Sequence, residues 1–122
     1  MPCDGYLGRV QIVRYHSETG YLASHQDPVD NQRLVVSIYL SKLGIDFQHG
    51  GLWALDRNNK KICLEPNLQI GDIGSYYAQI IHGVDKIDNG SDSERWWLGL
   101  FTNDSDLVQT RKTIEPAAIT SI

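Results

Sequence analysis

The stretch that decides the fold is Leu34-Val35-Val36-Ser37-Ile38-Tyr39-Leu40, the strongest strand signal in the chain. Seven other short segments with strand character lie on either side of it, separated by turn residues. Eight regularly spaced strands predict an all-β jelly roll, also called a double-stranded β-helix, with few or no helices. Residues 107–112 are the one candidate for a short helical turn. The other predicted strands are 9–15, 21–25, 51–55, 61–65, 73–78, 82–87 and 95–101.

The composition is that of one small domain. The 122 residues are 41% hydrophobic, enough for one modest core. We expect a single domain over 1–122, with an ordered core over 9–102 and a polar tail over 103–122. No run of 18 apolar residues is present, and the acidic, non-apolar first residues argue against a secretory signal. We therefore expect a cytoplasmic protein that does not enter a membrane. The net charge of −4, with scattered basic residues, argues against a nucleic-acid partner.

Three residues form the candidate metal site. His25-Gln26-Asp27 ends one predicted strand, and His82 begins another 57 residues later (82 − 25 = 57). Two imidazoles and one carboxylate can cap one face of an octahedral ion and leave the opposite positions open, as in non-haem Fe(II) sites. The alternative is an ordinary surface pair near a turn and a separate loop histidine.

Five further features follow one another along the chain. They are Tyr15 with Gly20 and Tyr21; His25-x-Asp27; Ile38-Tyr39-Leu40 followed by Gly50-Gly51; Glu65-Pro66 with Gly71-Asp72; and His82-Gly83-Val84 followed by Arg95. In this order they resemble the Fe(II)- and 2-oxoglutarate-dependent dioxygenases, in particular the prolyl hydroxylase-like branch. The resemblance implies an enzyme that holds Fe(II) and uses 2-oxoglutarate and O2, with ascorbate as an optional further cofactor, and releases succinate and CO2. It implies no catalytic residue beyond the metal centre.

The resemblance also assigns roles to individual residues. Arg95 is the candidate partner for the far carboxylate of 2-oxoglutarate, because a guanidinium fork pairs well with a carboxylate. Tyr39 stands where a family tyrosine hydrogen-bonds the same carboxylate, and Tyr15 is a further candidate. A surface salt bridge for Arg95 and plain core packing for Tyr39 are the alternatives. Halogenating relatives lack the carboxylate of the triad, so Asp27 favours hydroxylation of a small molecule or a peptidyl side chain.

Two features depart from the family pattern. Strand alternation places Trp97 on the same face as Arg95, where the indole would narrow the pocket unless a bulge near Trp96-Trp97 relieves it. Trp53, Trp97 and Phe101 are therefore candidates for the pocket lining, although core packing is the simpler interpretation.

The second departure is length. Only 24 residues precede His25, where family members carry elements that buttress the larger sheet. An unbuttressed sheet would expose apolar surface and favour a homo-oligomer. The alternative functions are a cupin-like metal-binding module without turnover and a truncated or degenerate oxygenase domain that binds a partner. The usual cupin cluster has His-x-His, whereas this chain has Gln26-Asp27.

Overall fold

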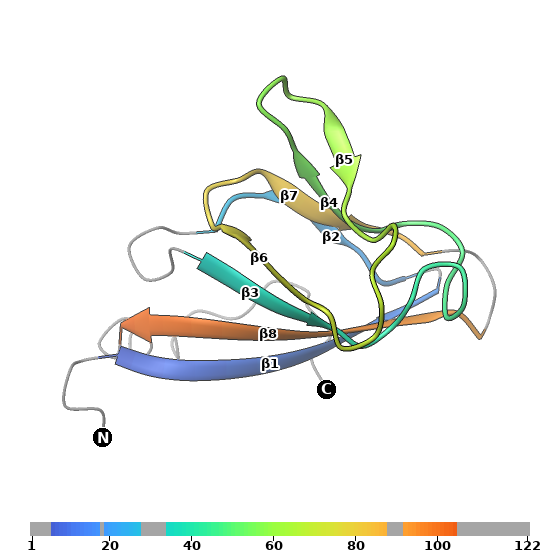
Figure 1. Cartoon of the computed structure of the whole chain (residues 1–122), viewed down its shortest axis with the longest axis horizontal. Helices are drawn as coiled ribbons and strands as arrows, with labels where there is room; N and C mark the ends of the chain where they lie inside the picture. Colours follow the sequence, from blue (N-terminus) through green and yellow to red (C-terminus); the bar gives the residue numbers. More distant parts are fainter. Residues whose placement is uncertain (1–5, 18, 28–33, 88–91, 105–122) are drawn as a thin grey trace.

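Eight β-strands make up the architecture (Figure 1). The structure, a computed structural model, describes residues 6–17, 19–27, 34–87 and 92–104, and these residues contain no helix. The all-β prediction is confirmed, while the helical turn predicted over 107–112 lies outside the described residues. The strands are β1 (Tyr6–His16), β2 (Leu22–His25), β3 (Leu34–Tyr39), β4 (Gly51–Leu55), β5 (Lys61–Cys63), β6 (Ile73–Tyr77), β7 (His82–Asp85) and β8 (Glu94–Asp104).

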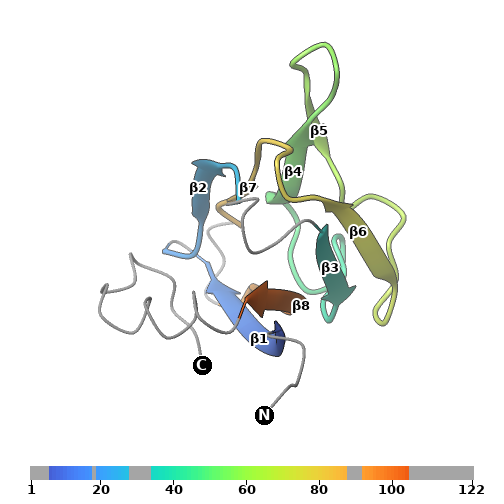
Figure 2. The ribbon, with the colours of Figure 1, turned by 90° about the vertical axis from the view of Figure 1, so that its left-hand side faces the viewer.

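The strands form two four-stranded antiparallel sheets. The major sheet has the order β1-β8-β3-β6, and the minor sheet has the order β2-β7-β4-β5. Successive strands alternate between the sheets, apart from β4 and β5, which form a hairpin within the minor sheet. This is the arrangement of a jelly roll, and the predicted fold class is confirmed. In both ribbon views β1 and β8 lie below β2 and β7 (Figures 1 and 2). No helix in the described ranges is long and apolar enough to cross a membrane.

β1 and β8 form the long base of the major sheet. They pair in continuous register from Tyr6↔Asp104 to His16↔Glu94, so no bulge interrupts β8. Side chains of β8 therefore alternate strictly between the inside and the outside of the sandwich. This alternation carries Arg95 and Trp97 to the same inner face, as the sequence predicts.

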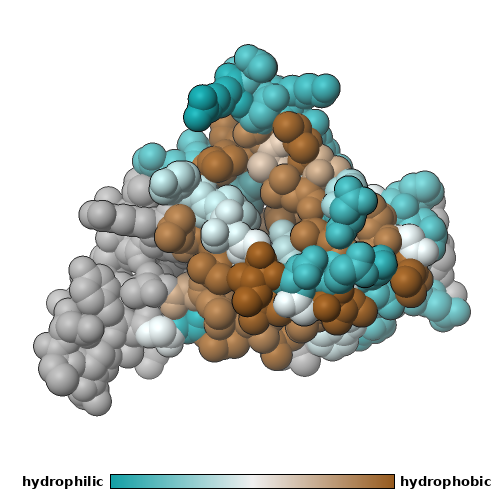
Figure 3. All heavy atoms as spheres, in the orientation of Figure 1, coloured by the Kyte–Doolittle hydropathy of each residue, from teal (hydrophilic) through white to brown (hydrophobic). Residues whose placement is uncertain are grey.

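The core lies between the two sheets. Its buried members come from both layers, and all but Tyr39 also line the space that holds the candidate metal site. The outer face of the major sheet is also apolar but remains exposed, with Val10 63% and Ile73 69% exposed. In the space-filling view, hydrophobic residues gather over the lower part of the molecule, where β1, β3 and β8 lie (Figure 3). The buried cluster is Val13, Tyr15, Tyr39, Leu52 and Val84.

Candidate metal centre

The two histidines of the triad are cross-strand neighbours. β2 and β7 pair antiparallel, and His25 is the register partner of His82. Directly opposed side chains on one face of an antiparallel pair lie close together, and the two ring centroids are 4.3 Å apart. Two histidines distant in the sequence therefore meet because the minor sheet places their strands side by side.

Asp27 completes the group from the connection after β2. Its backbone N–H donates to the Ala78 carbonyl at 2.8 Å, which fixes this part of the chain against the loop after β6. Its Oδ1 lies 3.3 Å from His25 Nε2, and its Oδ2 lies 3.4 Å from His82 Nε2. The three candidate ligand atoms all lie within 4.8 Å of one another. One divalent ion could therefore be held by all three side chains.

Both imidazoles are tied to the backbone through Nδ1. His25 Nδ1 lies 2.8 Å from the Ala23 carbonyl, and His82 Nδ1 lies 2.7 Å from the Ile80 carbonyl. A carbonyl can only accept, so each Nδ1 carries the proton and each neutral ring presents an unprotonated Nε2 towards Asp27. Backbone carbonyls commonly orient metal-binding histidines in this way. The donor set therefore fits a borderline or hard divalent cation such as Fe(II).

The two histidines have different electrostatic surroundings. A protonated His25 ring can donate its Nε2–H to Asp27, and this hydrogen bond raises the pKa of His25, while burial lowers the pKa of His82. Burial therefore favours the neutral form of His82, the form that binds a metal ion, whereas a proton on His25 competes with a metal ion. Tyr76 packs edge-on against His82 with 4.9 Å between ring centroids, and burial raises the pKa of its phenol.

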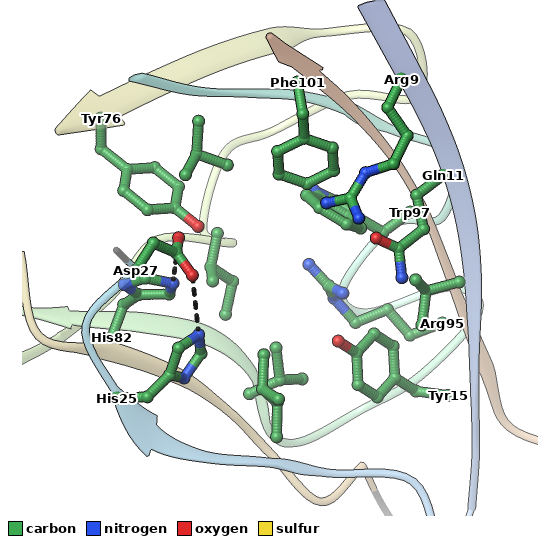
Figure 4. A pocket seen from close by; sticks show the side chains of 15 residues that line it. Arg9, Gln11, Tyr15, His25, Asp27, Tyr76, His82, Arg95, Trp97 and Phe101 are labelled. Carbon is green, nitrogen blue, oxygen red and sulfur yellow. Dashed lines mark ion pairs between the residues drawn. The ribbon is translucent and has the colours of Figure 1, made fainter. Parts of the chain in front are cut away.

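The triad faces a cavity of about 160 Å³ between the two sheets. Figure 4 shows the triad and Tyr76 on one side and two arginines, Arg9 and Arg95, on the other side. Asp27 is the only acid among the described residues that line this space. The full lining is Arg9, Gln11, Val13, Tyr15, Leu22, His25, Asp27, Val35, Leu52, Tyr76, His82, Val84, Arg95, Trp97 and Phe101.

Arg95 is buried in the wall opposite the triad, with 2% of its side chain exposed. Its Nε donates to Glu65 Oε1 at 2.6 Å, and its guanidinium lies 5.3 Å from the centre of the Tyr15 ring. Its Nη2 is buried and has no hydrogen-bond partner among the described residues. An unsatisfied buried donor is destabilising by about 1–3 kcal/mol, and a ligand carboxylate in the cavity would satisfy it.

Gly51 makes the Arg95–Glu65 pair possible. It adopts φ +97°, a left-handed conformation that favours glycine, and a Cβ there would lie 2.7 Å from Glu65 Cγ. Glu65 Oε1 also accepts a hydrogen bond from the Leu52 N–H at 2.8 Å. The carboxylate is therefore held by the backbone of β4, and it in turn holds the guanidinium.

Trp97 and Phe101 form an aromatic wall beside Arg95. Their rings meet edge-on with 6.0 Å between centroids, and Gly99 lies between them on β8. A Cβ on Gly99 would approach the Trp97 ring to 2.4 Å and the Phe101 ring to 2.6 Å. The missing side chain of Gly99 therefore accommodates the indole, since no bulge does so.

The structure distributes the other predicted site residues as follows. Tyr15 lines the cavity, and burial raises the pKa of its phenol. Tyr39 is buried on β3 but lines a separate depression beside β6, where it packs against Gly74; burial raises its pKa to about 12. Trp53 lies outside the cavity, with the Lys61 ammonium 4.5 Å from its ring centre.

Sequence reasoning missed four residues of the site. Arg9 and Gln11 share an inner face of β1 with Tyr15, which strand alternation alone could have indicated. Tyr76 precedes the second histidine, and the same alternation separates it from the exposed Tyr77. No sequence signal identified Glu65 as the partner of Arg95, because that contact depends on packing between the two sheets.

Comparisons with known proteins support the same fold. No protein-family model and no curated protein sequence matches the chain. Among solved structures, a 2OG-Fe(II) oxygenase family oxidoreductase from Burkholderia pseudomallei matches with TM-score 0.61 and 20% identity, over 81% of this chain and 44% of that one. A Pseudomonas putida prolyl-4-hydroxylase matches with TM-score 0.63 and 16% identity, over 81% and 53%. A Trichoplax adhaerens prolyl hydroxylase, solved with a hypoxia inducible factor peptide fragment, matches with TM-score 0.61 and 18% identity, over 92% and 49%.

These matches show a shared fold. The resemblance to 2-oxoglutarate-dependent Fe(II) oxygenases inferred from the sequence is confirmed at that level. The chain spans about half the length, or less, of the oxygenases it matches. What it binds and which reaction it performs are therefore proposals.

Proposed function

We propose that this protein is an Fe(II)- and 2-oxoglutarate-dependent oxygenase. One observation carries the proposal: two imidazoles, whose Nε2 atoms converge on the Asp27 carboxylate, face the unpaired Nη2 of Arg95 across one cavity. A ligand with an anionic group at each end would join the two sides. The oxygenases that share the fold make 2-oxoglutarate the natural candidate.

Each group of the chain has a defined task in this proposal. His25, Asp27 and His82 hold Fe(II), which together with 2-oxoglutarate and O2 supplies the oxidising chemistry and yields succinate and CO2. Arg95 binds the far carboxylate, while Glu65 fixes its orientation. Leu22, Val35 and Val84 keep water out of the cavity. With Asp27 as a ligand, hydroxylation is preferred to halogenation, on a small molecule or on a peptide such as the one bound by the Trichoplax enzyme.

The first experiment measures metal binding. Calorimetry with Mn(II), or with Fe(II) under anaerobic conditions, should show one ion per chain for the wild type. His82→Ala and Asp27→Ala should lower the affinity at least 100-fold, since each removes one of three ligands. His49→Ala removes an exposed histidine outside the site and should leave binding unchanged. If the wild type binds neither ion, the proposal is wrong.

A second candidate function is a metal-binding module without turnover. Two observations favour it: Arg95 is already paired with Glu65, and the cavity of about 160 Å³ is smaller than the roughly 300 Å³ at the low end of ligand pockets. Binding of the 2-oxoglutarate analogue N-oxalylglycine to the Mn(II)-loaded protein separates the two functions. Only the oxygenase should bind it and, in a separate assay with Fe(II), 2-oxoglutarate and O2, form succinate. Arg95→Lys should weaken the binding and lower the succinate yield.

A further inference from the structure

The depression beside β6 is larger than the metal cavity, and the proposed function leaves it without a task. Its volume is about 400 Å³, within the range of roughly 300–1,000 Å³ for ligand pockets, whereas the metal cavity of about 160 Å³ lies below that range. The β4–β5 hairpin bounds the depression on one side and β6 bounds it on the other. Its lining is Tyr39, Ala54, Leu55, Asp56, Ile62, Leu64, Leu68, Gly74, Ser75, Tyr76 and Ile80.

The lining of the depression is apolar and contains no cation. Its one acid, Asp56, is engaged by the hairpin turn, since Oδ1 accepts the backbone N–H groups of Asn58 at 2.8 Å and Lys60 at 2.9 Å. Burial raises the pKa values of Tyr39 and Tyr76, so both phenols are neutral. Such a lining would therefore bind an uncharged apolar group.

The apolar side chains of the depression remain in contact with solvent. Ile62 is 41% exposed, and Leu55 and Leu64 are half-buried. In the space-filling view, hydrophobic residues lie beneath the hydrophilic tip of the β4–β5 hairpin (Figure 3). A ligand that covers these side chains would remove apolar surface from water, which is the main driving force for such binding.

The depression adjoins the metal cavity. Tyr76 lines both spaces, and its ring packs edge-on against His82. Ala54, which also lines the depression, is the register partner of His82 across β4 and β7. A group bound in the depression is thus separated from a metal-binding histidine by one layer of side chains.

The size of the metal cavity indicates which ligand the depression would take. With 2-oxoglutarate at the triad and Arg95, a cavity of about 160 Å³ has little room for a substrate as well. Most of the substrate must then lie outside, and the depression is an adjoining space of sufficient size. A peptide would bring N–H and C=O groups that need partners, whereas the uncharged polar side chains of the lining are only the Ser75 hydroxyl and two phenols. This favours a substrate without peptide bonds.

We propose that the depression binds the hydrocarbon part of a small-molecule substrate, an alkyl chain or ring, and so holds the carbon to be oxidised near the metal. This inference rests on the proposed function, because 2-oxoglutarate is taken to occupy the metal cavity. It narrows the substrate from a small molecule or a peptide to an uncharged, largely apolar small molecule.

The test uses the full chain loaded with Mn(II) and saturated with N-oxalylglycine. The probes are 1-hexanol and cyclohexanol, each compared with diethylene glycol, which has the same number of non-hydrogen atoms, and with N-acetylleucine amide. Ligand-observed NMR titration gives the affinity. Broadening of the probe's proton resonances by Mn(II), relative to the Zn(II)-loaded protein, reports whether the probe lies near the metal. At least one alcohol should bind tenfold or more tightly than diethylene glycol, with its protons broadened.

Variants assign this preference to the depression. Ile62→Glu places a charge in the lining, and Ser75→Trp fills the depression from an exposed position on β6. Each should reduce the preference to less than threefold while leaving Mn(II) affinity and the circular dichroism spectrum unchanged. Ile70→Glu is the matched control, because Ile70 is 60% exposed and does not line the depression. It should leave the preference unchanged.

The outcomes separate this inference from the proposed function. If Mn(II) and N-oxalylglycine bind but neither alcohol is preferred, the inference alone is wrong. It is also wrong if the preference survives in both lining variants, or if the bound alcohol is not broadened. Tighter binding of N-acetylleucine amide than of either alcohol would overturn the small-molecule assignment. If Mn(II) or N-oxalylglycine does not bind the wild type, the proposed function fails, and the substrate assignment fails with it.

Discussion

The two faces of the major sheet depart from the usual arrangement in opposite ways. In most antiparallel sheets the inner face is apolar and the outer face is polar. Here the inner face carries Arg9, Gln11 and Arg95 among its buried core residues. The outer face carries apolar rows such as Ile12–Leu98–Ile38–Ile73 across all four strands. The difference shows that the inner face supplies polar side chains to the cavity, while the outer face is an exposed apolar surface of the kind that is normally covered.

The largest expected effect comes from breaking the inner face at Arg95. Arg95→Gln leaves Glu65 buried without a cation, which should destabilise the fold by about 3–5 kcal/mol. The outer-face control Arg14→Gln removes a half-exposed ion pair with Glu94 and should change stability much less, because such pairs contribute little. Urea unfolding of both variants measures the difference. Equal, small losses would show that the buried pair does not hold the inner face.

Gly99 should show the next largest effect. Gly99→Ala places a methyl group against the rings of Trp97 and Phe101, so we expect a loss of about 1–3 kcal/mol from overpacking. Replacing Trp97 by leucine in the same chain should recover part of this loss by making room. Thermal unfolding of the single and double variants tests the prediction, and a double variant less stable than either single one would contradict it.

The outer face should support weak self-association. Four strands about 4.8 Å apart and about seven residues long cover on the order of 450 Å², which is about half of the roughly 800 Å² per partner in stable complexes. We therefore expect the homo-oligomer inferred from the sequence to be a weak face-to-face dimer. Sedimentation velocity should detect it near 100 µM protein but not near 1 µM.

A pair of charge variants assigns the dimer to this face. Ile12→Lys combined with Ile73→Lys should raise the dimer dissociation constant at least tenfold. Ile45→Lys, at a residue 69% exposed outside the sheet, is the control and should have little effect. A wild type that stays monomeric at 100 µM, or a dimer unaffected by the double variant, would contradict the prediction.

The smallest effect is confined to alkaline pH. Burial raises the pKa values of Tyr15, Tyr39 and Tyr76, all on inner faces. Such phenols stay neutral when folded but ionise at about pH 10 when unfolded, so the free energy of unfolding should fall as pH rises above about 10. Absorbance at 295 nm, followed with circular dichroism, should show these tyrosines ionising only as the strands are lost. Complete ionisation of a still-folded protein would contradict this.

The sequence predicted the strands well because their signals are local. β3, β4 and β6 begin at the predicted residues, since alternation and turn residues act over short distances. β5 was predicted over 61–65 but ends at Cys63, because Glu65 turns inwards to reach Arg95. β1 and β8 extend beyond their predicted ends because each is supported by the other.

The site was harder to predict than the fold. The resemblance supplied His25, Asp27 and His82, which the structure brings into one group. It did not assign a role to Glu65 or Arg9. The Glu65–Arg95 pair joins residues 30 positions apart, and Arg9 stacks on Phe101 between β1 and β8, so both contacts arise only from tertiary packing. Strand alternation predicts the face of the sheet on which a side chain lies, but not how far along the strand the cavity extends. For this reason the prediction that Tyr39 and Trp53 belong to the site could not be checked from the sequence, and both lie outside the cavity. The compartment and the substrate stay predictions.

The pairing of β1 with β8 also sets the order in which the protein can be made. Contacts such as Arg14 with Glu94 span 80 residues, so β1 has no partner until almost the whole described chain has left the ribosome. Contacts of such long range slow folding. Until β8 arrives, the apolar residues of β1 stay exposed on the nascent chain, where chaperones would bind. Cells depleted of ribosome-associated chaperones should therefore yield less soluble protein.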